Sequence, residues 1–159
     1  MPKQEPTEAP EESDVPASKE SQAVAARQEQ SKAAKRATFD QLLNKPRRTT
    51  EIEILLPSAT GKMEDRETVS FKFVALGSVD YDKLVTKHPP TTDQRAEGAN
   101  YNIDTFGPDL LSRVCVDPEF TKAQWAELWT SPDWNRGEII DLFSTAAGLC
   151  MAGLEVPLS

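Results

Sequence analysis

The sequence predicts a mostly helical α+β fold, in which an N-terminal β-hairpin precedes a small bundle of four to five short helices. Three observations predict it. Apolar and polar residues alternate over residues 50–56 and 68–76, which indicates strands. From residue 78 onward, apolar residues recur at helical spacing. Residues 1–48 contain a single aromatic residue, Phe39, so this region is not expected to contribute to a core.

Charge divides the chain into three zones. Residues 1–20 carry a net charge of −4, residues 21–48 carry +5 and residues 49–159 carry −9. The apolar-poor start cannot offset the entropy lost on ordering. We therefore expect a disordered charged arm over 1–37, a short amphipathic helix and basic linker over 38–48, a folded α+β domain over 49–153 and a loose tail over 154–159. The acidic domain gives no reason to expect nucleic-acid binding, and only the basic zone could support it.

The short helix of the linker region has one apolar face. Phe39, Leu42 and Leu43 fall at positions i, i+3 and i+4, and Thr38 can cap the helix. Two interpretations remain open: a first helix packed against the domain, or a partner-docking motif on a flexible tether. The basic residues of 45–48 are interpreted as a solvated linker, with an acidic partner or a nucleic acid as the lesser alternative.

The two predicted strands each have one apolar face. The first face contains Ile52, Ile54 and Leu56, and the second contains Val69, Phe71, Phe73 and Ala75. The polar residues 57–66 connect the two strands, which indicates an antiparallel hairpin with a long loop. Because an isolated hairpin is not stable, its apolar face must be covered by helices or extended by another chain.

The helical segments follow in order. Gly77-Ser78 caps a helix whose stripe ends at His88 before two prolines, and Thr91–Glu97 forms a short polar helix closed by Gly98. A third helix starts near Asp104, with Pro108 in its first turn. Thr121-Lys-Ala-Gln124 is a capping box that opens the next helix.

The last helix is the most apolar of the series. Ser131 is expected as its N-cap and Pro132 as its first residue, an Asn135…Glu138 spacing lies just inside, and Gly153 ends it. Apolar residues occupy more than half of its circumference, so we predict that it is the central helix.

The sequence offers little for catalysis. The sole histidine, His88, is interpreted as a cap at a helix C-terminus, where a partial positive charge is favourable. The acid pairs near predicted helix starts suit the helix dipole without a carboxylate dyad. No Gly-rich phosphate loop and no metal-ligand spacing occur. We expect no enzymatic activity, no cofactor and no metal.

The remaining compositional features favour a soluble intracellular protein. Cys115 and Cys150 lack metal spacing and suit a reducing cytoplasm, where both are expected to be small buried hydrophobes. No apolar run approaches the roughly 18–20 residues that a membrane span needs. The N-terminus lacks the apolar segment of a signal peptide.

Three tryptophans, Trp125, Trp129 and Trp134, lie within ten residues of one another. Core and inter-helix packing is the main interpretation, and part of the group could anchor an interface. The candidate partner-binding residues are therefore Phe39, Leu42, Leu43, Trp125, Trp129 and Trp134.

Several segments follow one another in a characteristic order. They are Phe39-Asp-Gln-Leu-Leu43, Thr68–Leu76, Tyr81-Asp-Lys-Leu84, His88–Gln94, Gly98–Asn102, Phe106–Leu111 and Ala126–Trp129. This order, over residues 38–150, resembles the tail assembly chaperones of long-tailed (siphovirus-type) phages of actinobacteria. The resemblance implies a non-enzymatic protein that binds and solubilises the helical, aggregation-prone tape measure protein while tail tube subunits polymerise around it.

The resemblance also implies how the protein is made and where it acts. Programmed frameshifting yields a longer form that shares the N-terminal part, and this chain, which ends at Ser159, would be the shorter product. The implied partners are the tape measure protein, the longer frameshifted form and tail tube subunits, and weak self-association is compatible. The protein is expected in the host cell cytoplasm and absent from the mature virion. No partner-contacting residue follows from the resemblance.

Two alternatives stay open. One is a structural tail or head-completion protein that is retained in the virion. The other is a nucleic-acid-binding regulator that uses the basic residues of 27–48 and whose binding falls steeply with salt.

Overall fold

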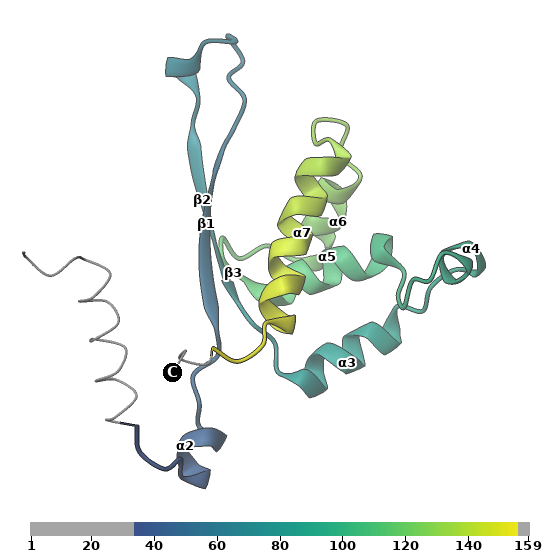
Figure 1. Cartoon of the computed structure of the whole chain (residues 1–159). Coiled ribbons are helices and arrows are strands. Elements are labelled where there is room, and N and C mark those ends of the chain that lie inside the picture. The colour runs from purple at the N-terminus through teal and green to yellow at the C-terminus, as the bar shows by residue number, and fades with distance from the viewer. Residues whose placement is uncertain (1–33, 156–159) are drawn as a thin grey trace, which may run out of the picture. The chain divides into compact units, whose positions relative to one another are not determined.

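A computed structural model describes residues 34–155 of the 159-residue chain (Figure 1). Most of the predicted disordered arm, and the end of the predicted tail, lie outside the described residues. The chain divides into two units, Leu43–Gly153 and the remainder. The prediction of a mostly helical α+β fold is confirmed. In order, the elements are α2 (Phe39–Leu43), β1 (Thr49–Leu55), the 3-10 helix η1 (Met63–Asp65), β2 (Thr68–Val74), α3 (Ser78–Lys87), α4 (Thr92–Ala96), α5 (Ile103–Val114), β3 (Cys115–Asp117), α6 (Lys122–Trp129) and α7 (Arg136–Met151).

The predicted antiparallel hairpin of β1 and β2 is confirmed. Its register pairs Ile52 with Phe71 and Ile54 with Val69, so the two apolar faces coincide. β2 also pairs with β3, which makes a sheet of order β1-β2-β3. The sequence predicts only the two strands of the hairpin, so β3 is an addition to the predicted sheet. Three residues are too few to show an alternating pattern, and β3 forms because the end of α5 delivers it to the edge of β2.

α5, and not α7, is the central helix. It contacts α3, α6, α7 and β3, and it buries a nearly continuous run that includes Phe106, Leu110 and Leu111. α7 is apolar over much of its surface, but it buries only Ile139, Leu142, Phe143 and Ala146. The prediction from composition was wrong because α7 covers one side of the core while α5 is enclosed by its neighbours.

Gly107 allows a close approach between α5 and α6. A Cβ added at Gly107 would overlap the six-membered ring of Trp129, so the ring lies against the α5 backbone itself. The next residue, Pro108, was predicted to lie in the first turn of this helix, but it is the sixth residue. Its missing N–H therefore leaves the carbonyl of Asp104 without a helical partner.

The helix starts follow local capping chemistry. The capping boxes Thr91/Gln94 of α4 and Thr121/Gln124 of α6 form, and the second was predicted. α7 begins four residues later than the predicted Pro132, because Asn135 and Glu138 make the capping box. Ser131 does accept the N–H of Asp133 at 3.2 Å, but that turn stops before Asn135. At α3, Gly77 occupies the N-cap position without a side-chain hydrogen bond.

α2 is a single short helical turn in the described part of the chain. Thr38 and Gln41 cap it reciprocally, with Thr38 N–H donating to Gln41 Oε1 at 3.1 Å and Gln41 N–H donating to Thr38 Oγ1 at 3.3 Å. It has no buried residue.

Candidate functional site

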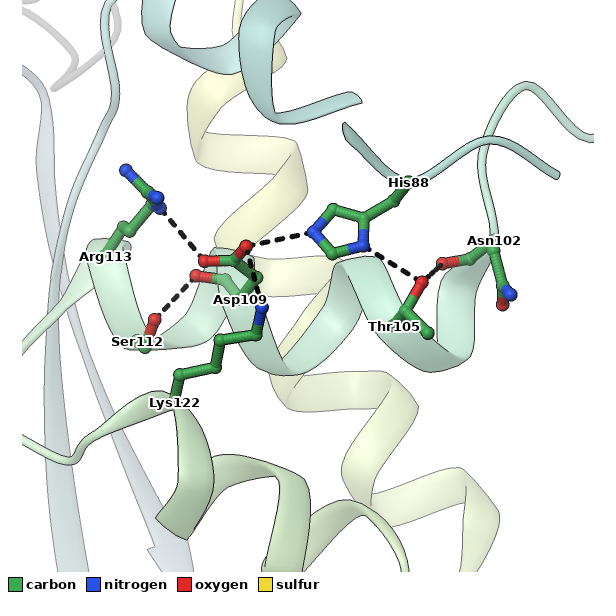
Figure 2. Close-up of polar contacts among 7 residues, drawn as sticks. All are labelled: His88, Asn102, Thr105, Asp109, Ser112, Arg113 and Lys122. Atoms are coloured by element: carbon green, nitrogen blue, oxygen red, sulfur yellow. Dashed lines mark hydrogen bonds and ion pairs between the residues drawn. The ribbon is translucent and has the colours of Figure 1, made fainter. Parts of the chain in front are cut away.

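Two features of the described residues could carry function. One is a buried polar cluster between α3 and α5 (Figure 2). The other is an apolar groove between β1 and α7, which we call the β1/α7 groove.

The polar cluster is centred on His88, the C-cap residue of α3. Its Nε2 lies 2.9 Å from Oδ2 of Asp109 on α5, and its Nδ1 lies 3.0 Å from Oγ1 of Thr105, one turn earlier. His88 is 8% exposed and Asp109 is 4% exposed. The imidazole therefore joins the end of α3 to two successive turns of α5, as Figure 2 shows.

Asp109 has two cationic partners in addition to His88. Arg113 Nε donates to Oδ1 at 3.0 Å and Lys122 Nζ donates to Oδ2 at 3.3 Å. Burial alone would raise the pKa of Asp109, but the hydrogen bonds from His88, Arg113 and Lys122 outweigh it and lower the pKa to about 2. The carboxylate is thus ionised and ties together α3, α5 and the start of α6.

The line Thr105, His88, Asp109 has the connectivity of a catalytic triad but not its chemistry. The Thr105 hydroxyl donates to the carbonyl of Asn102 at 3.3 Å, and both ring nitrogens of His88 already have partners within the fold. Asp109 is also paired with two cations, Arg113 and Lys122, and the imidazole of His88 is only 8% exposed, so it presents little surface to a substrate. We interpret the cluster as a structural cross-link.

Sequence reasoning placed His88 correctly at a helix end but missed its buried partner. Asp109 lies 21 residues away, and nothing in the spacing joins the two. The one available signal was an acid inside the apolar run 106–111, which is unusual for a buried helix face unless the acid is paired.

The β1/α7 groove lies along the less covered end of the hairpin. In β1, Ile52 and Ile54 are only half-buried, whereas Phe71 and Phe73 of β2 are buried. Figure 1 shows α7 running beside the hairpin, whose η1 end extends beyond the helices. The groove has a volume of about 230 Å³ and is lined by Ile52, Ile54, Leu55, Leu56, Pro57, Asp133, Trp134, Glu138, Asp141, Leu142 and Thr145.

The chemistry of the groove is apolar with an acidic rim. Its floor is built from the isoleucines and leucines of the hairpin together with Trp134 and Leu142. Asp133, Glu138 and Asp141 are its charged lining residues, and no lysine or arginine is part of the described lining. Such a surface favours an apolar partner that carries positive charge at its edges.

The six predicted partner-binding residues fall into three settings. Trp125 is fully buried and Trp129 is 7% exposed, so both lie in the core and present little surface to a partner. Trp134 is half-buried and lines the groove. Phe39, Leu42 and Leu43 on α2 are 76%, 63% and 67% exposed.

The two cysteines are free thiols in the described structure. Cys115 is buried and Cys150 is partly buried. Burial raises the pKa of the Cys115 thiol to about 11, and burial also raises that of Cys150. Neither is therefore suited to be a thiolate nucleophile.

No family of known proteins is identified for the chain, because comparisons with protein-family models, with curated proteins and with solved structures gave no match. Within residues 34–155, no group of three or more His, Cys, Asp or Glu side chains could hold a metal ion. No helix in this part of the chain is long and apolar enough to cross a membrane.

Proposed function

We propose that this chain is a tail assembly chaperone of a long-tailed phage, which binds and solubilises the tape measure protein in the host cytoplasm and leaves before the virion is complete. It is the shorter product of a frameshifted gene. The choice of family is supported by the order in which the characteristic sequence segments follow one another over residues 38–150. The β1/α7 groove is the observation that carries the binding role.

The groove suits the side chains of a helix better than a small molecule. At about 230 Å³ it is smaller than most small-molecule pockets, which run roughly 300–1,000 Å³. A few apolar side chains at positions i, i+3 and i+4 of an amphipathic helix would fill it. The acids of the rim would pair with lysine or arginine residues that flank such a stripe.

Weak individual contacts fit a chaperone that must release its client. One shallow groove covers only part of one helical stripe, so a long tape measure protein would need many copies. Copies held side by side on one client raise the effective concentration of every contact. Loss of neighbouring copies, as tail tube subunits polymerise, then weakens the rest together.

The first experiment tests how the gene is read. The gene is expressed with its downstream DNA intact and an N-terminal tag, and immunoblotting and intact mass are used to find a second, longer product. A minor longer band with a peptide that crosses into another reading frame is the expected result. A single product removes this support and makes the structural tail or head-completion protein an equal candidate.

The second experiment tests the groove. The chain is co-expressed with the tape measure protein of the same genome, and the soluble fraction of that protein is measured. Ile54→Glu puts a charge among the apolar groove residues at a side chain that is only half-buried, so the soluble fraction should fall. Val79→Glu, on the exposed side of α3, is the control and should change nothing. Mass spectrometry of purified virions should not detect the chain, and its presence there would favour the structural alternative.

A further inference from the structure

We propose that the β1/α7 groove is bound by the α2 helix of a second copy of this chain. The proposal concerns self-association of the purified protein, and it holds whichever client the protein has.

The exposed face of α2 and the floor of the groove are both apolar. Three of the large hydrophobic side chains that the described structure leaves exposed, Phe39, Leu42 and Leu43, lie together on α2. A helix of five residues is not stable in water by itself, because nucleation costs more than so few hydrogen bonds return. α2 therefore gains most when its apolar face packs on another surface, and the floor of the groove is apolar.

The charges around α2 and around the groove are opposite in sign. The groove has an acidic rim of Asp133, Glu138 and Asp141. On the two sides of α2 the chain carries Lys35 and Arg36, then Lys45 and Arg47, with Asp40 as the one acid between them. A helix with basic flanks therefore meets a groove with acidic edges, which is the pairing that electrostatics favours.

The residues between Leu43 and Arg48 form a short tether, and its length favours the groove of a second copy over that of the same chain. Arg48 is fixed to the folded unit, since its carbonyl accepts Ala75 N–H at 2.8 Å and its Nη2 donates to the Gly153 carbonyl at 2.5 Å. From Arg48 to Leu43 an extended chain spans at most about 18 Å. Ile54, in the middle of the groove, lies about 20 Å along β1 from Arg48.

The α2 of the same chain would thus need a fully stretched tether that folds straight back along β1. The α2 of a second copy has no such restriction. An arm that enters the groove of another copy leaves each pair with a free groove and a free arm, unless the two copies exchange arms reciprocally. Reciprocal exchange gives a closed dimer, and sequential exchange gives an open array.

Sedimentation velocity over a range of concentrations tests the proposal on the full-length chain. Leu42→Glu removes the apolar arm contact and Ile54→Glu blocks the groove. Each should weaken association about tenfold or more, because each puts a charge where the complex would bury an apolar side chain. Val79→Glu is the matched control, since Val79 and Leu42 are both 63% exposed. It should associate like the natural chain. Leu42 is exposed and Ile54 is half-buried in the single copy, and circular dichroism checks that both variants fold.

Mixing the two variants separates exchange between copies from occupancy within one chain. Leu42→Glu keeps a working groove and Ile54→Glu keeps a working arm, so the mixture should form one-to-one heterodimers that neither variant forms alone. If the natural chain associates but the mixture stays monomeric, the arm of one copy does not enter the groove of another and the proposal is wrong. A natural chain that stays monomeric at the highest soluble concentration also overturns it, as does association that neither substitution weakens.

A charge-reversal pair gives an independent check. Asp141→Lys on the rim should weaken association, and adding Lys45→Glu in the same chain should restore part of it in trans. Asp82→Lys, an exposed acid of α3 outside the groove, is the control and should have no effect. Association of the natural chain should also weaken as salt rises. An effect of Asp82→Lys equal to that of Asp141→Lys would mean that only net charge matters, and would overturn the assignment to the groove.

Discussion

Gly107→Ala is the sharpest test of the packing around the central helix. An alanine Cβ at this position would occupy space now filled by the ring of Trp129. The ring cannot move aside cheaply, because its Nε1 donates to Asp104 Oδ1 at 3.2 Å and its face carries the Arg136 guanidinium at 5.3 Å. It also packs edge-on against Phe143 at a centroid distance of 6.0 Å.

The magnitude follows from two opposing terms. Alanine in place of glycine favours a helix by about 1 kcal/mol. Displacing a buried tryptophan costs about 3–5 kcal/mol, if its contacts are lost as they are on truncation. The net expectation is a loss of about 2–4 kcal/mol in the free energy of unfolding. Gly148→Ala in α7 is the control, since an added Cβ there meets nothing within 4 Å, and it should gain about 0.5–1 kcal/mol.

Urea and thermal denaturation, followed by tryptophan fluorescence and circular dichroism, measure both variants against the natural chain. Their melting temperatures should differ by at least about 10 °C. In a Trp129→Phe background the penalty of Gly107→Ala should shrink, because the smaller ring leaves room for the methyl group. A Gly107→Ala variant as stable as Gly148→Ala would show that Trp129 does not lie on the α5 backbone, and the described core would be wrong at that point.

Three further predictions concern ionisation, capping and thiol reactivity. The pKa of Asp109 is lowered from 3.8 to about 2, so its contribution of about 2 kcal/mol is complete above pH 3.8 and is lost as pH falls towards 2. Denaturation at about pH 6 and about pH 3 should show part of this loss in the natural chain and a smaller loss in Asp109→Asn, which keeps the lowered pKa of Asp104. Asn135→Ala removes the capping box of α7 and should cost about 1 kcal/mol in thermal or urea unfolding, clearly more than Ser131→Ala; equal costs would favour the earlier helix start. A thiol reagent at about pH 8 should label Cys115 only as fast as the structure opens, because its pKa is about 11, and rapid labelling seen by intact mass would contradict its burial.

The parts of the fold that sequence predicts well are those in which local signals agree. Alternation places Ile52 and Phe71 on one face, and the observed register pairs them directly. Thr121 and Gln124 form their capping box because both groups that it needs lie within one turn. The predicted start of α7 at Pro132 was wrong, because Ser131-Pro132 and Asn135…Glu138 are both capping signals and the first was chosen. The second satisfies two backbone N–H groups reciprocally, and this stronger local satisfaction decides the boundary.

What sequence cannot supply is which segments meet across the fold. The position of β3 depends on where α5 ends, and the partner of His88 depends on the angle at which α3 meets α5, so neither follows from a local pattern. Trp125 and Trp134 lie only nine residues apart in the sequence, yet one is enclosed by the core and the other lines a groove. The difference arises because Trp125 faces α5 and the sheet from within α6, whereas Trp134 precedes the capping box that starts α7.

The groove, too, could not be predicted from the sequence. The alternation of β1 predicts that one face must be covered, and the length of α7 predicts that a helix is available to cover it. Neither predicts that α7 leaves Ile52 and Ile54 half-buried and sets Glu138 and Asp141 beside them. Burial of the apolar surface that remains exposed would be favourable. The acids at its edge favour a partner that carries positive charge. An amphipathic helix with basic flanks meets both conditions, and the natural chain carries one in α2, so the copy-exchange experiment decides whether the remaining cover comes from the protein itself.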